Sequence, residues 1–228
     1  MIRFTSLEKS GLSVAAMSGR EEGDCGIGDN ASANVTAFLR ALSLSPGQLF
    51  RVRQVHGIRV VEAVAIREGL PADFPEADGM ITNCPGVVLG ICVADCAPVL
   101  LYNPVIKAVA ALHAGREGIC HDIVSAGIHA LCTTYGGFPD QLQALIGPCA
   151  GGCCYEVSRE MADIWSAAGR ATQGRNLHLS LEIQHQLENN GVIRHNIEVV
   201  ASCTVCGGNF YSYRADGTPH RNLVVVML

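Results

Sequence analysis

Short apolar runs alternate with longer amphipathic stretches along this chain. Apolar runs of strand length, bounded by Gly, Pro or polar residues, predict strands over 49–56, 58–66, 87–93, 98–102, 108–113, 142–146, 197–201, 210–214 and 223–228. Apolar positions at helical spacing, with capping or stop residues at their ends, predict helices over 30–44, 118–135, 159–168 and 179–190. The result is a chain in which strands and helices are interleaved.

Several predicted strands follow one another directly, without a helix between them. This order favours an α+β fold with layers of mixed β-sheet flanked by helices over a doubly wound fold. Hydrophobic residues make up 49% of the 228 residues, which is enough to bury a large core. The length favours one domain, and we expect residues 1–228 to form it. Glycine-rich nucleotide-binding loops that follow a strand do not occur in the sequence.

Charge and the length of the apolar runs exclude two classes of partner. The net charge is −5, and the 16 basic residues form no stripe, so we expect no nucleic-acid partner. No apolar run reaches the roughly 18 residues of a membrane helix, so we expect no membrane partner either. Because charged residues make up only 16% of the chain, we expect apolar surface in a pocket or in the interface of a homo-oligomer.

The chain contains 11 cysteines, an odd number. Its N-terminus lacks the basic start and apolar stretch of a signal peptide, so we expect a cytoplasmic protein with reduced thiols. Cys203 and Cys206 form a C-x-x-C, but no second C-x-x-C or nearby His completes a metal site, and we interpret the pair as packing. Cys149, Cys153 and Cys154 surround two glycines, and we interpret these thiols as incidental.

Three segments carry candidate chemistry where the backbone leaves the core. His56 and His113 each stand at the end of a predicted strand, before or close to a Gly, and Cys96 lies in a polar loop between two strands. Two imidazoles and one thiolate form a known catalytic zinc set, with a water in the fourth position. Residue spacing does not establish that the three converge, and the alternative is a His that satisfies core polar groups and a Cys that fills space. Asp95, beside Cys96, is a candidate to orient a ligand His or to act as a general acid.

A series of motifs resembles the YfiH family, also called the laccase-domain or polyphenol oxidoreductase family. The resemblance extends from about residue 28 to residue 228. Its motifs are Gln-Val-His-Gly (54–57), Ala-Asp-Gly-Met-Ile-Thr (77–82), Val-Ala-Asp-Cys-Ala-Pro-Val-Leu-Leu (93–101), Ala-Ala-Leu-His-Ala-Gly (110–115), Ile-Gly-Pro (146–148), Cys-Tyr-Glu-Val (154–157), Cys-Thr (203–204) and Phe-Tyr-Ser-Tyr-Arg (210–214).

The resemblance implies a single-domain α+β protein with one zinc ion. The family's His, Cys and His ligands match His56, Cys96 and His113. It also implies phosphorolysis of purine nucleosides: adenosine, inosine or methylthioadenosine reacts with phosphate to give the base and a ribose 1-phosphate. Members are further credited with adenosine deamination. The older family name implies copper as the alternative metal and phenol oxidation as the reaction.

One departure from the family pattern bears on phosphate. The family reads His-Ala-Gly-Trp-Arg-Gly, whereas this chain has Arg116 and Glu117 in place of the Trp and the Arg. If the family's Arg binds phosphate, a carboxylate in its place would repel it, and the phosphate would need another cation. The candidates for phosphate binding are Arg59, Arg116, Arg214 and Arg221, with Arg53 as a further possibility.

Three other functions remain open at this point. Cys96 and His113 could form the nucleophile and base of a cysteine hydrolase, with Asp95 nearby. A copper polyphenol oxidase is disfavoured because the sequence contains no His-x-His pair. A non-catalytic paralogue that keeps only the fold would also explain the loss of the Trp-Arg pair.

Overall fold

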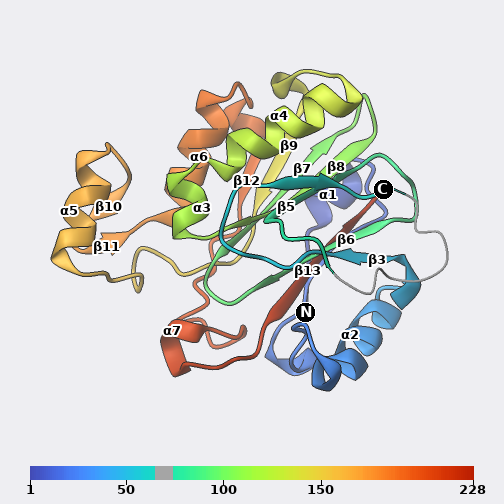
Figure 1. Ribbon diagram of the computed structural model, residues 1–228, viewed down its shortest axis with the longest axis horizontal. Coiled ribbons are helices and arrows are strands. Elements are labelled where there is room, and N and C mark those ends of the chain that lie inside the picture. Colours follow the sequence, from blue (N-terminus) through green and yellow to red (C-terminus); the bar gives the residue numbers. More distant parts are fainter. Residues whose placement is uncertain (65–73) are drawn as a thin grey trace.

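The computed structural model describes residues 1–64 and 74–228 (Figure 1). Its strands are β1 (Ile2–Arg3), β2 (Val14–Met17), β3 (Leu49–Arg51), β4 (Val60–Glu62), β5 (Gly79–Thr82), β6 (Val88–Val93), β7 (Ala97–Asn103), β8 (Ala108–Ala114), β9 (Gln143–Ile146), β10 (Thr172–Gln173), β11 (Asn176–Leu177), β12 (Ile197–Val199) and β13 (Asn222–Met227). Its α-helices are α1 (Thr5–Lys9), α2 (Asp29–Ala41), α3 (Arg116–Cys120), α4 (Ile123–Tyr135), α5 (Arg159–Ala167), α6 (Leu179–Asn189) and α7 (Tyr213–Asp216).

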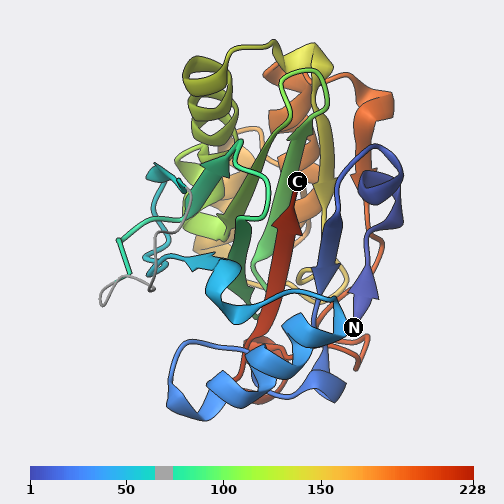
Figure 2. The ribbon, with the colours of Figure 1, turned by 90° about the vertical axis from the view of Figure 1, so that its right-hand side faces the viewer.

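Most strands belong to one of two large sheets. Sheet A has the order β1-β2-β13-β6-β3, and sheet B has the order β12-β9-β7-β8-β5-β4. Both sheets are mixed: β3 is parallel to β6, while β12 is parallel to β9 and β4 to β5. Figure 2 shows the red strand β13 running through the middle of sheet A beside the blue strand β2. These sheets, together with the helices, confirm the α+β class.

Apolar side chains divide into layers on both sides of each sheet. One cluster, which includes Met17, Leu89 and Leu100, lies between sheets A and B. The outer face of sheet B packs against α3, α4 and α6, and the outer face of sheet A packs against α2. Because both faces of the central strands are buried, those strands read as continuous apolar runs rather than as alternating ones.

Strand β8 illustrates this burial pattern and carries a candidate ligand. Val109 and Ala111 face the layer between the sheets, whereas Ala110 and Leu112 face the helices. His113 follows them near the end of the strand, where β8 pairs with Pro98 of β7. The packing of these apolar residues therefore fixes where His113 lies along the sheet and which way its side chain points.

Two sequence expectations about secondary structure are wrong. The segment 210–214 is not a strand: Ser212 caps the short helix α7 by accepting a hydrogen bond from the Ala215 amide, 3.1 Å away. The helix expected over 118–135 is broken into α3 and α4. Asp122 separates them with a left-handed backbone (φ of 64°) and caps α4 by accepting from the Ser125 amide.

Other expected elements are present with different bounds. The strand expected over 49–56 ends at Arg51, and the one expected over 58–66 is the short β4, with residues 65 and 66 outside the described residues. The N-terminal elements β1, α1 and β2, and strand β5, were not expected from the sequence pattern. No helix in the described part of the chain is long and apolar enough to cross a membrane.

Candidate active site

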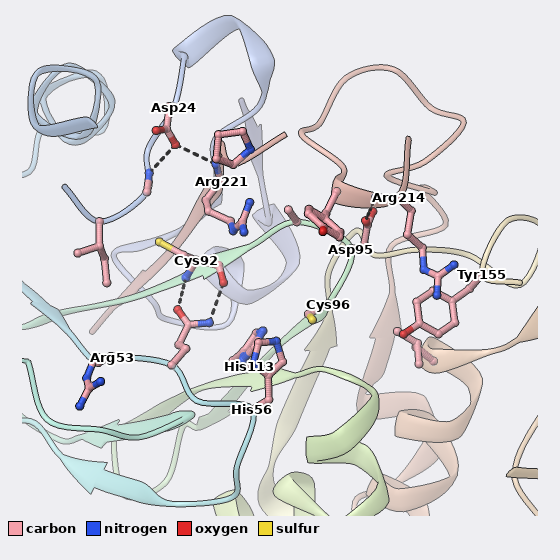
Figure 3. A pocket seen from close by; sticks show the side chains of 17 residues that line it. Asp24, Arg53, His56, Cys92, Asp95, Cys96, His113, Tyr155, Arg214 and Arg221 are labelled. Carbon is pink, nitrogen blue, oxygen red and sulfur yellow. Dashed lines mark hydrogen bonds between the residues drawn. The ribbon is translucent and has the colours of Figure 1, made fainter. Parts of the chain in front are cut away.

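The structure brings His56, Cys96 and His113 together at one end of the sheets (Figure 3). One ligand atom of each residue lies within 4.8 Å of those of the other two. His113 comes from β8, Cys96 from the loop between β6 and β7, and His56 from the loop after β3. The rings of His56 and His113 meet edge to face, with centroids 4.9 Å apart. The convergence that the sequence left open is therefore present.

The loop that carries His56 is held by side chains and by an isolated backbone bridge between Arg53 and Glu76. Gln54 makes two hydrogen bonds of 2.7 Å to the backbone of Cys92, one to the amide and one to the carbonyl. These bonds continue the contact between β3 and β6 beyond Arg51, where the strand itself ends. His56 then adopts a left-handed backbone with φ of 62°. Such strained residues persist only where their surroundings fix them, and they cluster at functional sites.

Asp78 is the residue that fixes this loop. Its carboxylate is fully buried and accepts hydrogen bonds from the amides of Val55 (3.1 Å), His56 (2.9 Å) and Gly57 (2.7 Å). The same carboxylate lies 2.8 Å from Nδ1 of His113. With Nδ1 donating its proton to Asp78, Nε2 of His113 is left free to act as a ligand. Asp78 therefore positions both histidines at once.

Asp95 was a candidate from the sequence to orient a ligand His or to act as a general acid, and its contacts in the structure are different from those of an orienting residue. The carboxylate of Asp95 accepts hydrogen bonds from the hydroxyls of Thr204 (2.7 Å) and Ser212 (2.6 Å) and from the amide of Arg214 (2.7 Å). Its backbone is left-handed, with φ of 85°. Asp95 thus ties the C-terminal loops to the loop of Cys96, while Asp78 is the carboxylate that contacts His113.

Two of the three candidate ligands, Cys96 and His113, have shifted pKa values. Burial raises the pKa of the Cys96 thiol, but hydrogen bonds from His113 and His56 outweigh it and lower this pKa to about 6. Burial also lowers the pKa of His113, but its hydrogen bonds to Asp78 and Cys96 outweigh that effect and raise the pKa to about 9. Without a bound ion, Cys96 and His113 therefore form a thiolate–imidazolium pair near neutral pH.

Gly115 leaves room for the convergence. A Cβ atom at this position would lie 2.9 Å from Sγ of Cys96 and 3.1 Å from Cδ2 of His56. The backbone of Gly115 is extended, with φ of −77°, so another residue could adopt it. The need for glycine is therefore a matter of space beside the two ligands, not of backbone conformation.

A cavity of about 1040 Å³ opens above the three ligands. It is lined by His56, Cys96 and His113 at one end and by Arg53, Arg214 and Arg221 among the cations. Its volume is at the upper end of the range usual for small-molecule sites, about 300–1,000 Å³. Figure 3 shows Arg221 with Asp24 on one side of the ligands and Arg214 with Tyr155 on the other.

The four arginines expected to bind phosphate divide into two groups. Arg214 and Arg221 line the cavity. Arg59 and Arg116 are not among the described residues that line it: Arg59 donates to the Glu76 carbonyl, 3.2 Å away, and Arg116 pairs with Glu117 and donates to the Met161 sulfur, 3.0 Å away.

Two residues that sequence reasoning missed hold the cavity's arginines in place. The guanidinium of Arg214 stacks 3.9 Å above the ring of Tyr155 and donates to the Glu156 carbonyl, 2.8 Å away. The backbone amide of Arg221 donates to the Asp24 carboxylate, 2.8 Å away. Tyr155 and Asp78 both stand in motifs quoted for the family resemblance, which was the available signal. Asp24 stands in none of those motifs.

The three ligands fit a metal ion by their chemistry. A thiolate and two imidazoles are soft and borderline donors, which suit zinc and copper better than magnesium or calcium. Three protein ligands leave one position open, as in catalytic rather than structural sites. The lowered pKa of Cys96 presents the thiolate that metal binding requires, and the hydrogen bond to Asp78 orients the His113 ring, whose Nε2 must release its proton when a metal binds.

Comparisons with known proteins agree over most of the chain. A purine nucleoside phosphorylase from Streptomyces griseus is 34% identical over 206 residues, which cover 86% of this chain and 81% of that protein. Another, from Deinococcus radiodurans, is 33% identical over 188 residues, covering 80% of this chain and 71% of that protein. Among solved structures, YlmD from Geobacillus stearothermophilus has a TM-score of 0.85 at 26% identity and covers 94% of this chain and 91% of its own.

A second solved structure supports the fold alone. The YfiH protein of Bacillus licheniformis has a TM-score of 0.83 at 24% identity, with 94% of this chain and 92% of that chain covered.

Residues 10–228 match the family described as multi-copper polyphenol oxidoreductase laccase. The match spans the loops of all three candidate ligands and the arginines of the cavity. The chain belongs to this multi-copper polyphenol oxidoreductase laccase family.

Proposed function

We propose that this protein is a purine nucleoside phosphorylase that transfers the ribosyl group of adenosine, inosine or methylthioadenosine to phosphate. The observation that carries the proposal is the cavity, which joins the three metal ligands to two arginines and an aromatic ring. Proteins of that name from Streptomyces griseus and Deinococcus radiodurans share most of the chain. In the reaction a phosphate oxygen bonds to C1′ of the ribose, the bond from C1′ to the purine breaks, and the purine leaves with a proton.

Arg214 and Arg221 are the residues that we assign to phosphate. Both guanidinium groups line the cavity, and a guanidinium presents paired N–H donors that match two oxygens of a phosphate. Their backbones are anchored to different carboxylates, Arg214 to Asp95 and Arg221 to Asp24. The two cations are therefore presented from separate loops, and Arg116 and Glu117 are not needed for this step.

Tyr155 borders the place we assign to the nucleoside, and Asp78 fixes the two histidines beside it. The ring of Tyr155, already stacked against Arg214, offers an apolar face beside the phosphate site. Asp78 holds the ring of His113 and, through the 55–57 amides, the backbone of His56, so both residues are positioned before substrate arrives. Such preorganisation favours a transition state in which charge develops on the ribose and the leaving base. Asp95 acts on the reaction only through the position of Arg214 and of the Cys96 loop.

We assign zinc to His56, Cys96 and His113. When bound, zinc would supply a Lewis acid. The same site would support adenosine deamination, which needs an activated water but no phosphate. A reduced thiol among the ligands requires a reducing compartment, and for that reason we place the protein in the cytoplasm.

The test is phosphate-dependent release of base from inosine and adenosine. Replacing Arg214 by Met removes a charge-assisted donor, a change of roughly 1.5–3 kcal/mol, so the KM for phosphate should rise about tenfold or more. The matched control is Arg194→Met, because Arg194 is exposed and pairs with Glu188. Deamination by the Arg214 variant should stay near the parent rate. Base release that does not depend on phosphate would refute the proposal.

The thiolate–imidazolium pair favours a second candidate, a cysteine hydrolase with Cys96 as nucleophile. Removal of metal distinguishes the two functions. A phosphorylase that depends on the bound ion loses activity when chelators strip it and regains activity with added zinc. A hydrolase is more active without metal and is inactivated by alkylation of Cys96.

A further inference from the structure

Four cysteines outside the cavity gather at a second place. Cys153 and Cys154 come from the turn after β9, and Cys203 and Cys206 come from the loop after β12. Their four sulfur atoms all lie within 4.8 Å of one another. The sequence offered no partner for the C-x-x-C of Cys203 and Cys206, because the second pair is adjacent in sequence and about fifty residues away. The fold supplies that partner.

The spacing of the sulfurs suits a single tetrahedral ion. With a zinc–sulfur distance of about 2.3 Å, the corners of a tetrahedron lie roughly 3.8 Å apart. The sulfurs of Cys153 and Cys206 are 3.8 Å apart, and all four atoms stay within the 4.8 Å limit. Four thiolates leave no open position, which is typical of a structural rather than a catalytic site.

The exposure of these four cysteines argues against a role as apolar filler in the core. An unpaired cysteine that serves as an apolar filler is usually among the most buried residues of a protein. Cys153 and Cys206 are exposed, and Cys154 and Cys203 are only half-buried. Four thiols grouped near the surface therefore gain little from burial, and a bound ion would account for their proximity.

The surrounding backbone is shaped for the approach of the two segments. A Cβ atom on Gly151 would lie 3.2 Å from Cβ of Cys203, and one on Gly207 would lie 2.5 Å from the Cys203 carbonyl oxygen. The amide of Gly151 donates a hydrogen bond to Sγ of Cys203, 3.2 Å away. An N–H donor aimed at sulfur stabilises the thiolate form that metal binding requires.

We propose that Cys153, Cys154, Cys203 and Cys206 bind a structural zinc ion, separate from the ion of the cavity. The ion joins two loops that support the cavity. Tyr155 directly follows Cys154, and Thr204, between Cys203 and Cys206, donates to the buried carboxylate of Asp95. Binding zinc here would therefore stabilise the wall of the cavity that carries Tyr155 and Arg214.

Zinc content per chain tests this proposal on protein purified without chelators. The double variant Cys153→Ser with Cys206→Ser should hold one zinc less than the parent. The matched control, Cys84→Ser with Cys132→Ser, changes two half-buried thiols outside both clusters and should keep the parent's content. The expected difference of one zinc does not depend on whether the cavity site holds metal, so it does not depend on the proposed function.

A second measurement covers the case in which the double variant fails to fold. The variant His56→Ala with Cys96→Ser removes two ligands of the cavity site and leaves the four cysteines intact. X-ray absorption at the zinc edge should then show one zinc per chain with four sulfur neighbours at about 2.3 Å. Nitrogen neighbours, fewer than four sulfurs, or no zinc in this variant would overturn the proposal. So would a disulfide between any two of the four cysteines in the protein as purified.

Discussion

Replacing Asp78 by Asn separates the metal ligands from the carboxylate that positions them. One oxygen of Asp78 accepts from the His56 amide (2.9 Å) and from His113 Nδ1 (2.8 Å). The other accepts from the Val55 amide (3.1 Å) and the Gly57 amide (2.7 Å). An asparagine keeps one of these oxygens and turns an NH₂ group toward the donors of the other. At least two N–H groups then lose their acceptor on a carboxylate that is fully buried.

The size of the effect follows from the charge and burial of this group. Hydrogen bonds to a charged partner contribute about 1.5–3 kcal/mol each, so two lost bonds should lower the free energy of unfolding by about 3–6 kcal/mol. That is a large share of the roughly 5–15 kcal/mol typical of a whole domain. Loss of a partner that orients a ligand His should also weaken zinc binding by about 10- to 100-fold.

The assay is urea unfolding of the metal-free protein together with zinc competition against a chelator. Asp122→Asn is the matched control, because Asp122 caps α4 and asparagine is an equally good cap. The urea midpoint and zinc affinity of the control should match those of the parent. If the Asp78 variant also matches the parent in both measurements, the positioning role assigned to this carboxylate is wrong.

The same variant has a distinctive pH dependence. Burial raises the pKa of Asp78, but hydrogen bonds from His113 and from the Gly57 and Val55 amides outweigh it and lower this pKa below its ordinary value. A lowered folded-state pKa stabilises the protein above the unfolded-state value of about 3.9, and this stabilisation is lost as the pH falls through the folded-state pKa. The stability difference between parent and variant should therefore be full at neutral pH and shrink in acid.

Two further predictions concern the ligands directly. Gly115→Ala places a Cβ 2.9 Å from Sγ of Cys96, so a chelator competition should show zinc binding weakened about tenfold or more. The control Gly47→Ala, whose Cβ meets only Ser45 at 3.9 Å, should bind zinc as the parent does. Equal zinc affinities of the two variants would refute the argument that Gly115 leaves space for the ligands. In metal-free protein, the thiolate absorbance that disappears in Cys96→Ser should rise through about pH 6, the pKa of Cys96. Zinc affinity should increase up to about pH 9 as His113 loses its proton. A thiolate signal that begins only above about pH 8 would contradict the ion pair of Cys96 and His113.

Sequence patterns predicted the buried strands and the longer helices well, because both carry strong local signals. The runs that became β6, β7 and β8 are apolar on both faces, and α5 has a serine cap. Segment 210–214 failed because its aromatic pattern favours a strand. A distant carboxylate, Asp95, binds Ser212 and the Arg214 amide there and holds the segment as a cap and helix instead.

The three candidate ligands could be named from the sequence, but the residues that hold them in place could not. His56, Cys96 and His113 stand at or beside expected strand ends, which a sequence pattern can indicate, although β3 itself ends at Arg51, before His56. The partner of His113 depends on the register of β5 against β8, which brings Asp78 beside it. Arg116 is directed away from the cavity by Glu117 and by Met161, 45 residues further along the chain. Contacts of that range are set by tertiary packing, so no local pattern reveals them.

The position of β13 has a consequence for how the chain folds. Strand β13 lies between β2 and β6 in sheet A and hydrogen-bonds to both. Its residue Val224 pairs with Met17 on one side and with Ile91 on the other, so each pairing closes a loop of more than a hundred residues. Early strands of sheet A cannot complete their pairing until this late strand has been inserted. Folding dominated by such distant pairings is slow, and until insertion the open edges of β2 and β6 are exposed to pairing with other chains.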